Sequence, residues 1–139
     1  MERLLPEIDD TNRFYWEAAR AHRLALLRCQ DCRTWIHPPR PNCWNCRSER
    51  LSAEQASGKG QVYSWSVMRT PGNPGFDHKL PYAVVVVEMD EQKGLFAIGN
   101  IDCPIEAIRL NLPVEVTYET LTEEVTLPQW KVAGGEGAR

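Results

Sequence analysis

The chain has 139 residues, enough for one ordinary domain or for a small domain beside a smaller one. A hydrophobic share of 42% and a charged share of 25% are typical of globular proteins, and a formal net charge of −3 gives no overall attraction to nucleic acid or anionic lipid. The sequence shows neither a signal-peptide core nor a bilayer-spanning segment, so we expect a cytoplasmic protein that binds no membrane and no nucleic acid.

The opening residues predict a helix within an N-terminal segment at 1–23. Residues 9–12 offer polar caps and acidic charge where a helix begins, and positive side chains gather at residues 20–23, where it ends. Between them Phe14, Ala18 and Ala21 recur at helical spacing. The aromatic cluster is larger than one buried face usually needs, so we expect part of it to bind a partner protein. The predicted partner contacts are Phe14, Tyr15 and Trp16.

A short strand predicted at 24–28 leads into two Cys-x-x-Cys pairs, which are Cys29 with Cys32 and Cys43 with Cys46. In a reducing compartment, two such pairs indicate a metal site more strongly than disulfides or two redox dithiols. Four thiolates fill the tetrahedral shell of zinc and leave no place for an activated water, so the predicted zinc is structural. It would supply folding energy to a segment with too few apolar residues for its own core.

From residue 60 onward the pattern is that of β-strands. Tyr63, Trp65 and Val67 alternate with serines, as in a half-buried strand, and residues 84–87 are four consecutive valines that predict a strand covered on both faces. Five strands in so short a stretch predict a small closed barrel of the OB type. The other predicted segments are a connector at 51–59, a turn at 90–94, strands at 95–101, 114–119 and 125–132, and a mobile tail at 134–139.

Three further features carry weaker hypotheses. His37, between the two cysteine pairs, is interpreted as a surface or packing residue because four cysteines already complete the shell. Cys103 has no motif around it, and we interpret it as a buried or incidental thiol. The loop at 69–79 combines cations with an aromatic ring and is a candidate to bind a phosphate and a base or acyl chain, although an ordinary solvated loop is equally consistent. Its candidate ligand-binding residues are Arg69, Phe76, His78 and Lys79.

Several short motifs occur in a characteristic order. They are Phe-Tyr-Trp at 14–16, Leu-Ala-Leu-Leu-Arg-Cys-Gln-Asp-Cys at 24–32, Pro-Pro-Arg at 38–40, Gly-Lys-Gly-Gln-Val-Tyr-Ser at 58–64, Leu-Pro-Tyr-Ala-Val at 80–84 and Leu-Pro-Val at 112–114. In this order they resemble the family catalogued as domain of unknown function thirty-five, the acyl-CoA-associated proteins with a rubredoxin-like zinc ribbon and an OB-fold. Arg33 and Asn111 stand where that family usually has glycine.

The resemblance implies a fold and a role. The fold would be mainly β, with an N-terminal helical segment at 1–23, a rubredoxin-like zinc ribbon at 24–50, a five-stranded OB-fold domain at 51–133 and a flexible tail at 134–139. The role would be that of a non-catalytic accessory subunit in a hetero-oligomer with a thiolase-like or lipid-transfer-protein-like aldolase, thiolase or acyltransferase. The complex would act on acyl-CoA or steroid-CoA thioesters, and the small chain would help to form the CoA thioester site.

Two other functions remain open at the level of sequence. A single-stranded nucleic-acid-binding module is one, because zinc ribbons and OB barrels both serve that role, although the acidic side chains of the barrel half argue against it. An enzyme that uses Cys103 as its nucleophile is the other, and it lacks a recognisable base.

Overall fold

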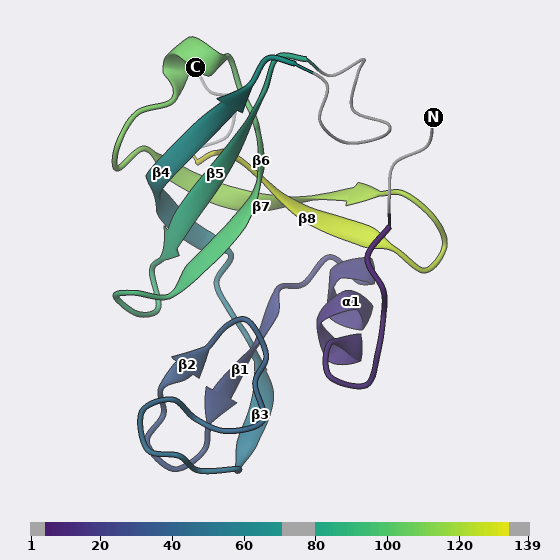
Figure 1. Ribbon diagram of the computed structural model, residues 1–139, viewed down its shortest axis with the longest axis vertical. Helices are drawn as coiled ribbons and strands as arrows, with labels where there is room; N and C mark the ends of the chain where they lie inside the picture. Colours follow the sequence, from purple (N-terminus) through teal and green to yellow (C-terminus); the bar gives the residue numbers. More distant parts are fainter. Residues whose placement is uncertain (1–4, 71–79, 134–139) are drawn as a thin grey trace.

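The computed structural model describes residues 5–70 and 80–133. Figure 1 shows a β-barrel above a small sheet of β1, β2 and β3, with α1 beside this sheet and beneath β8. The predicted fold class is confirmed: a mainly β chain with an N-terminal helix, a ribbon and a five-stranded barrel. The elements are α1 (Arg13–Arg20), β1 (Ala25–Cys29), β2 (Trp35–Ile36), β3 (Leu51–Gln55), β4 (Lys59–Met68), β5 (Tyr82–Met89), β6 (Phe96–Asp102), the 3-10 helix η2 (Ile105–Ala107), β7 (Pro113–Thr120) and β8 (Thr126–Val132).

Helix α1 begins at Arg13, so Asn12 is its N-cap, the last of the cap candidates predicted at residues 9–12. The Asp9 carboxylate instead accepts the N–H groups of Thr11 and Asn12, at 2.9 and 3.0 Å, and so closes a turn that precedes the helix. The buried side of α1 is small, with Ala18 and Ala19 packed where the helix meets β1 and β8. This side lets the helix backbone approach both the ribbon and the barrel.

The lower sheet is the ribbon, with strand order β2-β1-β3. Strand β3 pairs with the whole of β1, from Ala25 opposite Gln55 to Cys29 opposite Leu51, so the connector predicted at 51–59 is wrong over these five residues. The prediction failed because β3 is an edge strand with mostly exposed polar side chains, which leaves no apolar alternation to detect. Arg28 on β1 also forms an ion pair with Glu54 on β3 at 3.4 Å.

The upper sheet closes into a barrel with strand order β4-β5-β6-β8-β7. All neighbouring strands are antiparallel except β6 and β8, which meet in parallel over two residue pairs. The interior is filled by side chains that are essentially inaccessible to solvent. These are Val62, Val85, Val87, Val114 and Trp130.

Two predictions about the barrel strands are wrong in detail. Tyr63 and Trp65, at 53% and 40% exposed, do not share a half-buried face. A β-bulge between Val62 and Ser64 shifts the register, so that Trp65 pairs with the inward Val85 whereas Tyr63 follows the inward Val62. The valine run is also not covered on both faces. Residues 85 and 87 point into the barrel and residues 84 and 86 are only half-buried on its outer side.

The ribbon and the barrel share one hydrophobic core. Leu24, Leu26 and Trp35 from the ribbon side belong to the same buried cluster as the barrel interior. The side-chain amide of Gln92, in the β5–β6 turn, accepts the Trp35 N–H at 2.9 Å and donates to the Trp35 carbonyl at 3.1 Å. The division of the chain into segments at residues 23, 50 and 133 stays a prediction. In the described part of the chain, no helix combines the length and the apolarity that a bilayer crossing requires.

Candidate functional site

The two cysteine pairs sit on two backbone turns of the same design. Cys29 donates its N–H to the Thr34 carbonyl at 2.9 Å and accepts the Arg33 N–H at 3.0 Å. In the second turn Cys43 donates to the Ser48 carbonyl at 2.8 Å and accepts the Arg47 N–H at 2.9 Å. The residue after each pair is left-handed, with φ of 66° at Arg33 and 69° at Arg47. This repeated turn presents two sulfurs from each side to a common centre.

The four sulfurs form a compact cluster of zinc-site size. Cys29 Sγ lies 3.6 Å from Cys46 Sγ, Cys32 Sγ lies 3.6 Å from Cys43 Sγ, and all four lie within 4.8 Å of one another. A zinc–sulfur bond of about 2.3 Å requires tetrahedral edges of about 3.8 Å. The set therefore fits a closed Cys₄ zinc site.

Backbone amides point at the sulfurs, as a site for thiolates requires. The N–H groups of Asp31 and Cys32 approach Cys29 Sγ at 3.4 Å each, and those of Asn45 and Cys46 approach Cys43 Sγ at 3.3 and 3.4 Å. These donors stabilise negative charge on sulfur before any metal is considered.

The surroundings lower the pKa of Cys29 and Cys32 and raise that of Cys46. The hydroxyl of Thr34 and then the amide of Asn45 lower the pKa of Cys32 to about 5, and the Cys32 N–H lowers that of Cys29. For Cys46 the Ser48 amide acts to lower the pKa, but lost hydration and the neighbouring sulfurs outweigh it and raise that pKa to about 12. A dication at the centre would remove this conflict because it favours all four thiolates.

His37 does not belong to the metal cluster. Its ring stacks on Tyr15 with centroids 5.5 Å apart, burial lowers its pKa, and its Nδ1 is buried without a hydrogen-bond partner in the described structure. The interpretation of His37 as a packing residue agrees with this placement.

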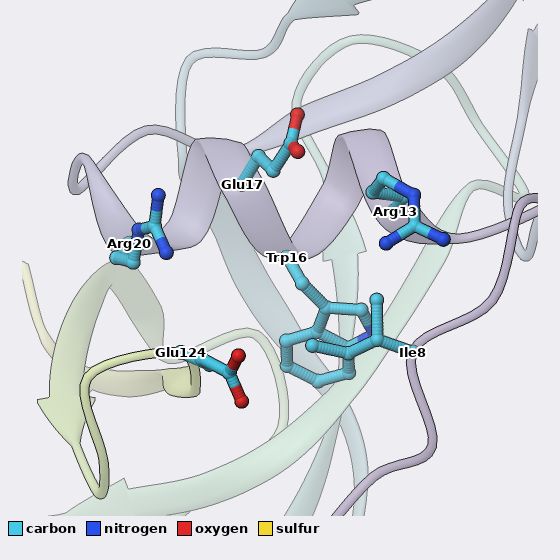
Figure 2. A pocket seen from close by; sticks show the side chains of 6 residues that line it. All are labelled: Ile8, Arg13, Trp16, Glu17, Arg20 and Glu124. Carbon is cyan, nitrogen blue, oxygen red and sulfur yellow. The ribbon is translucent and has the colours of Figure 1, made fainter.

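The three aromatic residues predicted to bind a partner lie in different surroundings. Tyr15 packs against the shared core, and burial, followed by the charge of Tyr118, raises its pKa to about 12. Phe14 is half-buried. Trp16 lines a cavity of about 410 Å³ beneath α1, where its indole lies between the side chains of Ile8 and Glu124 (Figure 2). None of these placements tests partner binding, which stays a prediction.

Most of the predicted ligand loop lies outside the described residues. Arg69 is described and lies exposed just after β4, whereas Phe76, His78 and Lys79 fall in the part that is not described. Cys103 is described at the end of β6. Burial and then the charge of Asp102 raise its pKa, and its thiol donates to the Pro104 carbonyl at 3.4 Å. A raised pKa is the opposite of what a nucleophilic cysteine needs.

The sequence reasoning missed two surfaces of the barrel. One is a cavity of about 540 Å³ between β5, β6, β7 and β8, lined among others by Asn100, Tyr118 and Gln129. The other is the outer face of β4, β5 and β6, where Ile98 is 68% exposed and the Tyr63 ring lies 4.6 Å from that of Phe96. Only the strand register places these residues together, and a single sequence does not give it.

Comparison with known proteins places this architecture in a family. The rubredoxin-like zinc ribbon domain of ChsH2 matches residues 16–52, and the C-terminal OB-fold domain of ChsH2 matches residues 53–119. A solved structure named Ltp2-ChsH2(DUF35) aldolase superposes with a TM-score of 0.82 at 36% identity, covering 92% of this chain and 98% of that one.

Two curated relatives extend the comparison. A probable enoyl-CoA hydratase alpha subunit of Thermomonospora curvata is 36% identical over 92% of this chain, which spans only 39% of that relative's length. A DUF35 domain-containing scaffold protein of Methanocaldococcus jannaschii is 32% identical over 70% of this chain and 69% of its own length. The chain belongs to the DUF35 family, with the zinc ribbon and OB-fold of ChsH2.

Proposed function

We propose that this chain is a non-catalytic accessory subunit that binds a larger, thiolase-like enzyme acting on acyl-CoA thioesters. The observation that carries the proposal is the apolar outer face of β4, β5 and β6, which we call the barrel face. It is defined by Tyr63, Val84, Val86, Phe96 and Ile98.

The barrel face has the character of a protein contact. Phe96 and Ile98 alternate with the buried Ala97 on β6, and Val86 on β5 lies opposite Ile98, so these side chains share the outer surface. A contiguous apolar surface of this kind is costly to leave in water and commonly marks an interface. The similarity to a chain of an aldolase complex and to a hydratase alpha subunit supports a larger enzyme subunit as the occupant.

The chemistry of the described side chains supports an accessory role. The four-sulfur cluster offers a metal no open coordination position, so the metal there would hold structure rather than activate water. Cys103 has a raised pKa. The carbon–carbon or hydration chemistry would then belong to the partner.

We propose acyl-CoA thioesters as the substrate class of the complex because the Thermomonospora curvata relative is named as a subunit of a probable enoyl-CoA hydratase. A steroid-CoA thioester falls within the same proposal. Loop 69–79 follows directly on β4, one of the strands of the barrel face, and we propose that its side chains help to hold the CoA moiety at the boundary with the partner. The proposed contacts are Arg69, Phe76, His78 and Lys79.

The test is to produce the chain with the large subunit encoded beside it. We expect a stable complex on gel filtration, with thioester turnover that the small chain alone does not show. Ile98→Asp should weaken the complex by at least about 30-fold, as loss of an interface anchor does. Leu5→Asp, at a 50% exposed site in the segment before α1 and outside β4, β5 and β6, is the matched control and should bind normally. A large subunit that does not bind the chain and is fully active alone would refute the proposal.

A further inference from the structure

The ribbon carries a charge opposite to that of the whole protein. Residues 24–50 hold five arginines and two acids, whereas the chain as a whole has a net charge of −3. Most of these arginines are paired on the ribbon itself. Arg28 and Arg33 form ion pairs with Glu54, and Arg50 pairs with Asp31.

Two arginines of the ribbon remain without a counter-ion. Arg40 and Arg47 are exposed and form no ion pair or side-chain hydrogen bond within residues 5–70 and 80–133. The only nearby acid in sequence that is also unpaired there is Glu49. The unpaired charge of this stretch is therefore net positive.

Trp44 lies between Arg40 and Arg47 in the sequence, on the second cysteine turn, and its side chain is 54% exposed. In the described structure its ring stacks on no other aromatic ring and on no guanidinium, in contrast to Trp35, which Arg28 covers at 4.7 Å. An indole is a large apolar group, and the metal-site turn that carries it offers no core in which to bury it.

The backbone beneath this surface is firmly held. The flanking Cys43 accepts two amide N–H groups at its sulfur, and Asn42 Nδ2 donates to the Arg47 carbonyl at 3.4 Å. Trp44 is thus presented on a preorganised turn, and little conformational entropy would be lost when a partner covers it.

We propose that Arg40, Trp44 and Arg47, the ribbon tip, form a second docking surface that takes an acidic surface of the partner subunit. Tryptophan and arginine are the residue types that most often dominate binding energy at protein interfaces. The inference rests on the proposed function for the identity of the partner, but not on the barrel face, since the ribbon tip lies between β2 and β3 of the ribbon whereas the barrel face is formed by β4, β5 and β6.

Charge favours a protein over a nucleic acid as the occupant. A nucleic acid footprint of ordinary affinity neutralises about 6–10 phosphates, and the ribbon tip offers two cations on an acidic protein. Two arginines around an indole match a small acidic patch with a recess for the ring.

The test measures binding of the co-encoded large subunit to the zinc-loaded full chain at low and high salt. We expect Trp44→Ala to weaken binding by about 30-fold, the loss typical of an interface anchor. The double variant Arg40→Gln with Arg47→Gln should weaken it several-fold at low salt and flatten its salt dependence. Lys93→Gln removes an exposed positive charge from the β5–β6 turn and should change neither quantity. Metal content is measured for every variant to confirm an intact ribbon.

Each outcome decides one claim. If the wild-type chain binds the large subunit and the ribbon-tip variants stay within twofold of it, the ribbon tip is not a docking surface and the accessory function stands. Failure of the wild-type chain to bind at all removes both proposals. Salt-dependent binding of a labelled single-stranded oligonucleotide that needs Arg40 and Arg47 would overturn the protein partner in favour of nucleic acid.

Discussion

Left-handed residues mark both metal-site turns. Arg33 follows the first cysteine pair and Asn111 lies before β7, and both stand where the DUF35 family usually has glycine. Both keep the left-handed backbone, with φ of 66° and 64°. Arg47 has the same conformation at 69° in the second turn, where no glycine was expected. An arginine is strained there because its Cβ approaches the following carbonyl, whereas Asn tolerates this region better.

We therefore predict that Arg47→Gly stabilises the zinc-bound protein by about 0.5–1 kcal/mol, since glycine adopts this conformation freely. Arg33→Gly should stabilise it less, because Arg33 also pairs with Glu54 at 3.1 Å. Arg40→Gly, at a residue without positive φ, is the control and should be destabilising. Urea unfolding of the three variants gives the order, and an unstable Arg47→Gly would show that the turn is unstrained.

Burial of His37 gives stability a pH dependence. Its pKa in the folded protein lies below the ordinary 6.5 because burial disfavours the imidazolium. As pH falls through 6.5 the unfolded chain therefore takes up a proton that the folded chain does not, and stability decreases until the lower folded pKa is passed. His37→Phe keeps a ring over Tyr15 and should reduce the loss of stability between pH 7.5 and 5.5.

Urea midpoints across this pH range, with bound metal measured at each pH, separate the histidine from acid release of the metal. Equal slopes for wild type and variant would mean that His37 titrates alike in both states.

At the scale of elements, the sequence was informative wherever a chemical or periodic signal was local. The cysteine spacing predicted the four-sulfur cluster, and the alternation at residues 114–119 predicted β7. Strand β3 was not predicted because its partner β1 is separated from it in the sequence by the cysteine-containing loops. The bulge at Tyr63 was not predicted because it arises from the pairing of β4 with β5. The barrel face likewise depends on register rather than on any single strand.

Gln92 replaces a neighbouring strand at the edge of the ribbon. Its amide makes both hydrogen bonds that a strand residue would make to Trp35 on β2. We predict that Gln92→Ala destabilises the protein by about 1–3 kcal/mol, because two backbone groups lose their partner where the turn covers them. Gln92→Glu should also destabilise it, since a carboxylate cannot donate to the Trp35 carbonyl. Thermal unfolding measures both, and Lys93→Ala, at an exposed position in the same turn, should change little.

Across the whole molecule, the two lobes differ in what stabilises them. The barrel interior closes around its own valines and Trp130, whereas the separate buried cluster of the ribbon consists of Cys29, Cys43 and Ile36. The ribbon also contributes Leu24, Leu26 and Trp35 to the shared core, so its loss would expose apolar surface on the barrel. A metal held by the four cysteines would therefore stabilise the ribbon directly and the barrel indirectly.

Metal removal should accordingly unfold the molecule in a fixed order. Cys43→Ser or strong chelation should release the metal, and amide hydrogen exchange in β1 and β3 should then accelerate by orders of magnitude while β5 and β6 stay protected. The remaining barrel should be less stable by about 2 kcal/mol or more, the amount expected from exposing a buried Leu26 side chain. Cys103→Ser, at the cysteine outside the cluster, should retain the metal and the exchange pattern of the wild type. Continued protection of β1 and β3 without metal would mean that the shared core alone folds the ribbon, and the metal would then have another role.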